Sequence, residues 1–179
     1  MDLNINSPLP DRKDWRIGCV GSGFIMNDCH LVAYSKAGFN PVAIASRTQV
    51  NAAKCAKQHK ITRVHESIEM LLNDESIEVL DLAVPPDNQL DVIKAACKRG
   101  IVKGILAQKP LGSNYAEALE AVESCEKAGI TLAVNQNMRY DQSVRAGKTL
   151  LTKGIIGEPV LANIDMRGIP HWMPWQERQ

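Results

Sequence analysis

The chain has 179 residues, 45% of them hydrophobic and 23% charged, which is ordinary for one globular domain or for two if one is small. A net charge of +1 without a basic stripe argues against nucleic acid as a partner. No apolar run approaches the roughly 20 residues of a membrane-spanning helix, and residues 1–14 lack the apolar core of a signal peptide. We therefore expect a cytoplasmic protein without membrane contact.

The cysteines and histidines give no sign of a metal site. The five cysteines are scattered, odd in number and without a C-x-x-C pair, which is typical of reduced and mostly buried thiols. The four histidines have no ligand spacing with one another or with the cysteines. We expect no metal, and we expect His171, in the tail, to be a structural or surface residue.

A glycine turn follows the first apolar run, residues 16–20. Gly21 permits a tight turn, and Gly23 lets the backbone approach a pyrophosphate. A helix starting near Phe24 would direct free N–H groups at the phosphates. Its helical spacing runs through Ile25, Cys29, Val32 and Ala33, to a stop near Gly38. The third glycine of the dinucleotide motif is replaced by Met26, so an ordinary glycine turn in a parallel sheet is the alternative.

Short apolar runs and helical segments alternate through the following residues. We expect strands at 41–46, 62–64, 78–84, 101–106 and 130–134, and helices at 48–59, 67–73, 90–99 and 113–127. The second helix has Val50, Ala53 and Ala56 at helical spacing, and Ser113 is the expected N-cap of the last. This alternation predicts an α/β fold with a doubly wound parallel sheet, a Rossmann domain, over residues 15–138. Its loops at the carboxyl ends of the strands would form a ligand crevice.

The two ends of the chain depart from this rhythm. Residues 1–14 read as an N-terminal arm, disordered or docked. Residues 140–153 predict a helix, 154–157 a turn, and 159–167 a strand with one covered face. Such a lone strand is an unpaired edge, and Trp172 and Trp175 have nothing beside them as cover. We therefore expect residues 139–179 to begin a second, truncated α+β domain.

Four motifs occur in order at the ends of successive strands: Gly21-Ser-Gly-Phe-Ile25, Ala83-Val-Pro-Pro86, Gln108-Lys-Pro110 and Asn137-Met-Arg-Tyr140. Together they resemble the Gfo/Idh/MocA family, the glucose–fructose oxidoreductase-like NAD(P)-dependent dehydrogenases. The tail segment 154–160 is similar to that family's entry into its second domain, and the likeness covers residues 15–168. It implies a second domain that supplies much of the substrate pocket, an oligomer interface and an Asp/His pair, for which no counterpart can be assigned here.

The resemblance makes Lys109 the candidate catalytic residue, because it corresponds to the lysine of the family's Glu-Lys-Pro motif. Beside a nicotinamide ring and partly shielded from water, this lysine would hydrogen-bond a substrate hydroxyl or help move its proton during hydride transfer. Pro110 would fix the backbone behind it, with a cis bond as one way. Gln108 replaces the family's glutamate, so the negative neighbour of the ammonium is missing. A solvated loop lysine is the alternative.

The segment Ser46-Arg47-Thr48 bears on the choice of cofactor. An acid at the end of the second strand would bind the ribose 2′-hydroxyl and repel a 2′-phosphate, and none occurs from residue 43 to 51. Arg47 can instead bind the phosphate through paired hydrogen bonds, to which Ser46 and Thr48 add. The segment therefore predicts NADP(H) over NAD(H), with a structural surface arginine as the alternative.

The remaining candidate residues each have a structural alternative. The loop 84–88 either lines the cofactor or only ends its strand, while Asn137 and Arg139 either reach the cofactor or support the helix that follows. Gln89 stands where the family often has a histidine. The full set of candidate cofactor-binding residues is Gly21, Gly23, Phe24, Ile25, Ser46, Arg47, Thr48, Val84, Pro85, Asn88, Gln108, Lys109, Asn137 and Arg139.

These features predict an NAD(P)-dependent oxidoreductase that transfers a hydride between its cofactor and a polyol, a sugar or a related hydroxy or keto compound. The small-molecule substrate class and a homo-oligomeric full-length form are implied by the resemblance alone. A cofactor-binding regulatory or interaction protein without turnover is the alternative, favoured by Gln108 and by the missing second domain. A third interpretation is a doubly wound domain that binds another nucleotide or a sugar.

Overall fold

The computed structural model describes residues 2, 3 and 5–165. The chain divides into two compact units, one formed by Ser7–Met138 and the other by Met1–Asn6 with Arg139–Gln179. Four features of the sequence analysis lie outside the described residues: the end of the strand predicted at 159–167, His171, Trp172 and Trp175.

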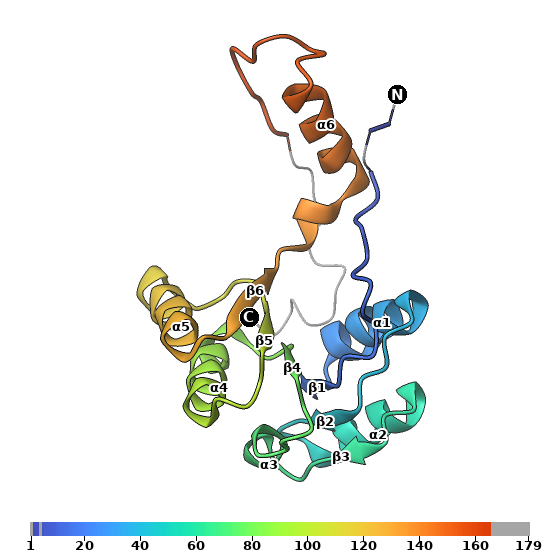
Figure 1. Cartoon of the computed structure of the whole chain (residues 1–179), viewed down its shortest axis with the longest axis vertical. Coiled ribbons are helices and arrows are strands. Elements are labelled where there is room, and N and C mark those ends of the chain that lie inside the picture. The colour runs from blue at the N-terminus through green and yellow to red at the C-terminus, as the bar shows by residue number, and fades with distance from the viewer. Residues whose placement is uncertain (1, 4, 166–179) are drawn as a thin grey trace. The chain divides into compact units, whose positions relative to one another are not determined.

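The larger unit is built on a six-stranded sheet in the order β3-β2-β1-β4-β5-β6, with every neighbouring pair parallel (Figure 1). The strands are β1 (Ile17–Val20), β2 (Ala43–Ala45), β3 (Arg63–Val64), β4 (Val79–Leu82), β5 (Gly104–Gln108) and β6 (Thr131–Asn135). This order is that of a Rossmann sheet, and it confirms the predicted fold class. The order reverses between β1 and β4, where such sheets bind their ligands.

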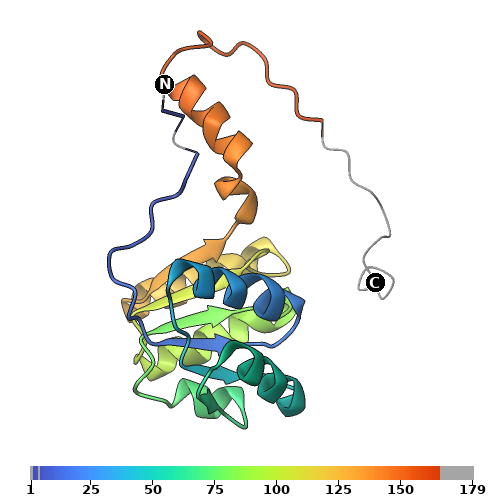
Figure 2. The ribbon, with the colours of Figure 1, turned by 90° about the vertical axis from the view of Figure 1, so that its right-hand side faces the viewer.

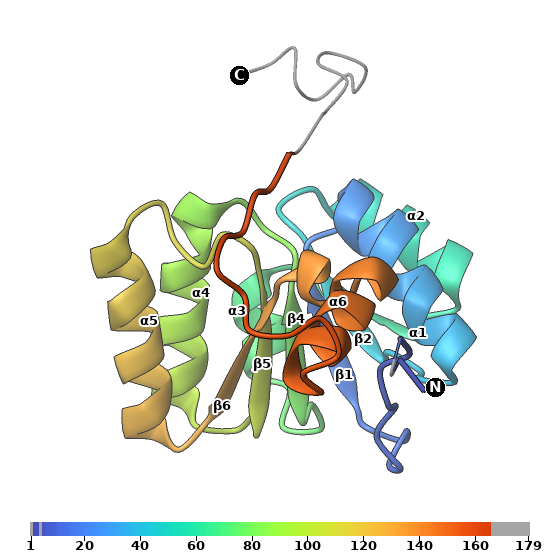
Figure 3. The same ribbon diagram turned by 90° about the horizontal axis from the view of Figure 1, so that it is seen from above.

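Helices cover both faces of this sheet. They are η1 (Ile25–His30, a π-helix), α1 (Leu31–Ala37), α2 (Gln49–His59), α3 (Ile68–Leu72), α4 (Pro86–Arg99) and α5 (Tyr115–Ala128). Figure 2 shows α1 and α2 in front of the strands, and Figure 3 shows α4 and α5 on the opposite side of the sheet. Both faces are therefore removed from water over the first strands, as their continuous apolar sequences predict.

Two cores result from the alternation of side chains along each strand. On one face, Leu80 and Leu82 of β4 pack with apolar residues of α3, α4 and α5. On the other face, Ile17 and Cys19 of β1 pack with residues of η1, α1 and α2. The five cysteines are free thiols, and Cys19, Cys55 and Cys125 are buried, as their pattern predicted.

The predicted inner face of the first helix is wrong by one residue. Ile25 and Cys29 are exposed, whereas Met26, His30 and Leu31 are buried. Met26 and His30 are four residues apart, as in an α-helix, so the offset from Ile25 and Cys29 is already present where the helix begins. The π-helical turn, in which the Leu31 N–H donates to the carbonyl oxygen of Met26, holds one residue more than an α turn and brings Leu31 to the buried side as well.

Two helix starts also differ from the prediction. Helix α4 begins at Pro86, earlier than residue 90, because proline at the first helical position loses no hydrogen bond and already has a helical φ. Asn114, rather than Ser113, caps α5: its side-chain oxygen accepts a hydrogen bond from the Glu117 N–H at 3.0 Å. The sequence predicted the prolines only as the end of a strand, and it placed the cap of α5 one residue too early.

Helix α2 buries a different set of residues from the one predicted. Ala52, Cys55 and Ala56 face the core, while Val50 and Ala53 are exposed. Both sets have helical spacing, and because several of these side chains are short, the sequence pattern hardly distinguishes a buried face from an exposed one. The sequence period therefore identified the helix without fixing its rotation about its own axis.

The smaller unit contains α6 (Gln142–Thr152), which follows the 3₁₀ turn η2 (Asn137–Tyr140). Backbone oxygens of the N-terminal arm accept hydrogen bonds from this helix, as in the 2.8 Å bond from the Thr149 hydroxyl to Leu3. The predicted turn at 154–157 is present. The predicted strand is not formed over residues 159–165, because the described residues of this unit offer it no partner strand.

None of the helices in residues 2, 3 and 5–165 combines the length and the apolarity needed to cross a membrane. In the same residues, no three His, Cys, Asp or Glu side chains come together in a way that would hold a metal ion.

Candidate cofactor site

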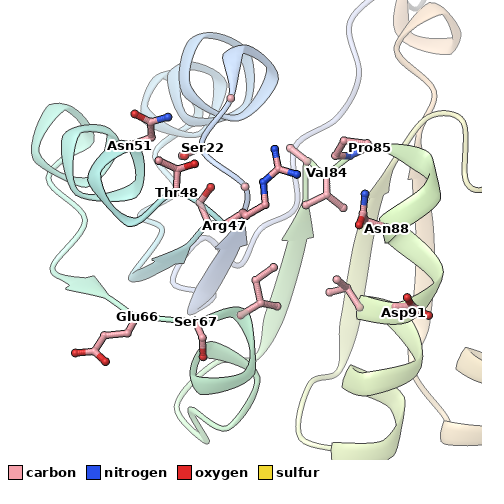
Figure 4. A pocket seen from close by; sticks show the side chains of 16 residues that line it. Ser22, Arg47, Thr48, Asn51, Glu66, Ser67, Val84, Pro85, Asn88 and Asp91 are labelled. Atoms are coloured by element: carbon pink, nitrogen blue, oxygen red, sulfur yellow. The ribbon is translucent and has the colours of Figure 1, made fainter.

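A cleft of about 610 Å³ lies at the carboxyl ends of β1, β2 and β4, beside the point where the strand order reverses (Figure 4). Most of the residues predicted to bind a cofactor line it: Gly21, Gly23, Ser46, Arg47, Thr48, Val84, Pro85 and Asn88. Ser22, Asn51, Glu66 and Ser67 complete much of the remaining wall. The loops of three strands are thus brought into a single cavity, while the roles of their residues stay predictions.

The turn after β1 requires glycine at its first position. Gly21 has a φ of +103°, and a Cβ built on it would lie 2.4 Å from the carbonyl oxygen of Ala83. Its N–H donates to the Ala45 carbonyl oxygen at 2.8 Å, which ties the turn to β2. Gly23 differs, because a Cβ added there meets no atom within 4 Å. The space beside Gly23, which lines the cleft, is therefore open.

Met26 occupies the position of the third motif glycine. It is fully buried and packs in the core between β1, η1 and α2. A glycine there lets a first helix lie against its strand. Here the methionine side chain fills that space, within the π-helical turn.

Arg47 reaches into the cleft from the end of β2. Figure 4 shows its guanidinium between Thr48 on one wall and Val84 on the other, and Glu66 pointing away from it. Arg47 is exposed, and within residues 2, 3 and 5–165 no carboxylate forms an ion pair with it. A cation held in this way is available to an anionic group of a ligand.

The opposite wall is made by the end of β4 and the first turn of α4. β4 ends at Leu82, and after two further residues Pro85 precedes the helix and Pro86 opens it. Pro85 and Asn88 are exposed to the cleft, and Val84 is half-buried beside them. This wall presents apolar surface with one amide, which suits the packing of a flat ring.

The other predicted residues lie outside this cleft. Phe24 lines a smaller neighbouring hollow, and Ile25 is exposed on the outer side of η1. Gln108 is the last residue of β5 and Lys109 follows it, Asn137 lies in η2, and Arg139 belongs to the smaller unit.

The backbone of the loop after β5 is hydrogen-bonded to the side chain of Gln89 of α4, which is fully buried. The Gln89 side-chain oxygen accepts a hydrogen bond from the Gln108 N–H at 2.9 Å, and its amide nitrogen donates to the Pro110 carbonyl oxygen at 2.7 Å. The Lys109–Pro110 bond is cis. The Lys109 side chain is exposed in this structure, whereas from the sequence we expected it to be partly shielded from water beside a nicotinamide ring.

Sequence reasoning missed a buried pair beside this loop. His30 is 8% exposed and Asp81 is 0% exposed, and the ring Nδ1 lies 2.9 Å from the nearer carboxylate oxygen. The Tyr34 hydroxyl donates to the same oxygen at 2.8 Å, and burial together with the Asp81 charge raises the pKa of Tyr34 well above its usual range. The available signal was Asp81 itself, because a carboxylate inside an apolar strand needs a partner.

A sequence model of the oxidoreductase family with an NAD-binding Rossmann fold, Gfo/Idh/MocA, matches residues 15–136. The chain belongs to this family. The family's nicotinamide-binding fold is the one observed here, with its strand-order reversal at the cleft.

Relatives and solved structures agree with this assignment. D-apiose dehydrogenase of Paraburkholderia graminis is 25% identical over 87% of this chain and 41% of its own length. For 1,5-anhydro-D-fructose reductase of Ensifer adhaerens the identity is 26%, over 83% of this chain and 44% of the relative. An oxidoreductase from Agrobacterium radiobacter in complex with NAD⁺, L-tartaric acid and magnesium superposes with a TM-score of 0.76 at 25% identity, over 82% of this chain and 42% of that one. The chain thus spans less than half the length of these relatives.

Proposed function

We propose that this chain carries the cofactor-binding part of an NAD(P)-dependent oxidoreductase acting on a sugar, a polyol or a related hydroxy or keto compound. The observation that carries the proposal is the cleft at the strand-order reversal, with the Gly21 turn on one side and the loop 84–88 on the other. The substrate class is supported by the names of two relatives, which act on D-apiose and on 1,5-anhydro-D-fructose.

The residues of the cleft fit a dinucleotide. The open space beside Gly23 would accept the pyrophosphate, and the start of the first helix would point N–H groups toward it. Arg47 and Thr48 would hold the adenosine ribose, and Val84 and Pro85 would pack against a ring. When bound, the nicotinamide supplies the hydride acceptor or donor.

The finer proposal is that NADP(H) binds more tightly than NAD(H). Arg47 is exposed toward the cleft, and residues 43–51 contain no acid that would repel a 2′-phosphate. Hydrogen bonds to a charged phosphate would favour NADP(H) by about 1–3 kcal/mol.

Calorimetric titration of residues 1–179 with both cofactors at moderate salt tests both statements. Arg47→Ala should remove most of the preference for NADP(H) and leave NAD(H) affinity nearly unchanged. Arg99→Ala is the matched control, because it removes the same charge at the far end of α4. Equal affinities of the wild type for the two cofactors would refute the preference, and no binding of either would refute the cofactor site.

Lys109 is proposed as the residue that contacts the substrate hydroxyl and moves its proton. Residues 139–179 are proposed to begin the second domain, which would supply the far wall of the substrate pocket. Apolar side chains in the described part of that segment support this idea, because Val160, Leu161 and Ile164 are 88–97% exposed. A homo-oligomer stays a prediction from the family resemblance.

A cofactor-binding protein without turnover is the second candidate function. One observation favours it: the side chain of Gln108 engages His30 and the backbone of Lys109, and it brings no carboxylate to the lysine. A version extended to the length of the relatives separates the two. Cofactor binding with no hydride transfer to any sugar or polyol would favour the second candidate over the first.

A further inference from the structure

A chain of buried polar groups runs beneath the loop that carries Lys109. It starts at the Tyr34 hydroxyl, passes through the Asp81 carboxylate to the His30 ring, and ends at two side-chain amides. His30 Nε2 lies 2.8 Å from the amide nitrogen of Asn135 and 3.3 Å from that of Gln108. These amides end β6 and β5, so the chain reaches the carboxyl edge of the sheet from inside the fold.

His30 is the last residue of the π-helical turn Ile25–His30, and it is buried four residues after Met26, a spacing that an α-helix would also give. The extra residue of the turn brings Leu31 to the buried side next to it. Turns of this kind are rare and recur at functional sites, so the position of His30 calls for an explanation beyond packing.

The hydrogen bonds fix where the proton of the ring lies. The Lys109 N–H donates to the side-chain oxygen of Gln108 at 2.8 Å, so the other end of that amide, a donor, faces His30. Turning the Gln108 amide over would place two donors together at Lys109. His30 Nε2 is therefore an acceptor, and the single ring proton sits on Nδ1, where it is donated to Asp81.

We propose that Asp81 and His30 are positioning residues for the loop that carries Lys109. Asp81 holds the ring with Nε2 as an acceptor, the ring holds the Gln108 amide, and the oxygen of that amide holds the backbone of Lys109. The proposal rests on the proposed function in one respect, because Lys109 matters to turnover only if it contacts substrate. The hydrogen-bonded chain itself does not depend on turnover.

A glutamine at position 108 therefore suits a His30 ring whose Nε2 carries no proton. With Gln108→Glu, a carboxylate would face the lone pair of Nε2 in a half-buried place, which is repulsive. The ring relieves this repulsion by taking up a second proton and donating to both Asp81 and the new carboxylate. Gln136→Glu makes the same change at an exposed position of the next loop and serves as the control.

Nitrogen NMR of histidine-labelled residues 1–179 at neutral pH tests the assignment without any activity. The wild type and Gln136→Glu should show a His30 ring protonated only at Nδ1, and Gln108→Glu should show protons on both nitrogens. A wild-type ring protonated at Nε2 would overturn the proposal, as would a Gln108→Glu ring unchanged from the wild type.

The link to Lys109 is tested by kinetics in the version extended to the length of the relatives. His30→Leu should lower kcat by up to about 100-fold, the cost of a displaced catalytic group, with cofactor affinity within a few-fold of the wild type. His30→Gln should recover part of that loss, because its amide can donate to Asp81 and its oxygen can accept from Gln108. Unchanged kcat in His30→Leu, or equal losses in both variants, would overturn the positioning role.

The NMR test and the kinetic test can each fail without the other. Absence of turnover in a cofactor-binding wild type would refute the proposed oxidoreductase function, while the NMR result would still decide the hydrogen-bonded chain. If His30→Leu does not fold, the kinetic link between His30 and Lys109 is decided by comparing His30→Gln with the wild type. A kcat of His30→Gln equal to that of the wild type supports the link only if NMR also places the ring proton on Nδ1.

Discussion

Two parts of the carboxyl edge of the sheet are built in opposite ways. In the cleft at β1 and β2, the polar side chains of Arg47 and Thr48 are exposed and turned toward open space. In the loop after β5, the backbone on both sides of Lys109 is held by Gln89, which is fully buried, and by Gln108 against His30.

The difference shows what each part is suited to do. A binding wall leaves its hydrogen-bonding groups available to the ligand, so it stays open until the ligand arrives. A group that must meet a reacting atom works best when its position is set in advance, since small displacements are costly in rate. Under the proposed function, the cleft would select a cofactor and the loop after β5 would place one side chain.

The largest effect is expected at Lys109 itself. In the version extended to the length of the relatives, Lys109→Ala should lower kcat by roughly 10²–10⁴, the usual contribution of a general acid or base. Cofactor affinity should stay within a few-fold, because Lys109 does not line the cleft. Steady-state kinetics with calorimetry measures both quantities, and Lys98→Ala on the exposed side of α4 is the control. Near-normal turnover would make Lys109 a surface residue.

Gln89→Leu tests whether the hydrogen bonds of Gln89 stabilise the loop after β5. The side chains are similar in size, but leucine leaves the Gln108 N–H and the Pro110 carbonyl oxygen without their partner. The loss of each of these part-buried hydrogen bonds should lower the free energy of unfolding by about 0.5–1.5 kcal/mol. Urea denaturation measures this change, and the exposed Gln58→Leu provides the comparison. Equal stability of the two variants would show that the loop does not depend on Gln89.

Substitutions of the two glycines in the first turn should affect different properties, the stability of the fold at Gly21 and cofactor affinity at Gly23. Gly21→Ala should lower the free energy of unfolding by at least about 1–3 kcal/mol, because it combines a left-handed φ with a Cβ against the Ala83 oxygen. Gly23→Ala should leave stability nearly unchanged and weaken NADP(H) binding, because its methyl would occupy the open space proposed for the pyrophosphate. Thermal unfolding and calorimetry provide the two readings. Wild-type affinity in Gly23→Ala would place the phosphates elsewhere.

The smallest effect is expected at the opposite, amino end of β4. Hydrogen bonds from Lys103 and Arg12 lower the pKa of Glu78 from its usual 4.5 to about 2. A carboxyl whose pKa is lower in the folded state stabilises the fold above pH 4.5, and this contribution is lost as the pH falls toward 2. Melting temperatures of Glu78→Gln should therefore fall less over this interval than those of the wild type, with cofactor affinity unchanged. Parallel curves would contradict the assignment.

Much of the fold was predictable because its signals are local. Alternating apolar runs and helical segments gave the strands and their order of appearance, and Gly21 marked the first turn. The loop residues of the cleft followed from the rule that ligands bind at the carboxyl ends of parallel strands. Helix starts were harder to predict, because a proline such as Pro86 is compatible both with the end of a strand and with the first position of a helix.

The supports of the site were not predictable in the same way. Gln89 and His30 are polar residues on helices, and their polarity alone would assign them to a solvated face. Their partners lie 19 and up to 105 residues away, so no local pattern connects them. The sequence pattern also placed the inner face of the first helix at Ile25 and Cys29, one residue before the buried Met26 and His30.

The separation between His30 and Asn135 also has a consequence for the order of folding. During synthesis β1 and its helix emerge early, but the amides that pair with the ring lie 78 and 105 residues later. Until β5 and β6 join the sheet, the inward side of the first helix carries an acceptor without its donors. We expect early folding intermediates to be loosest at this helix, and its amide hydrogens to gain protection only when the last strand docks.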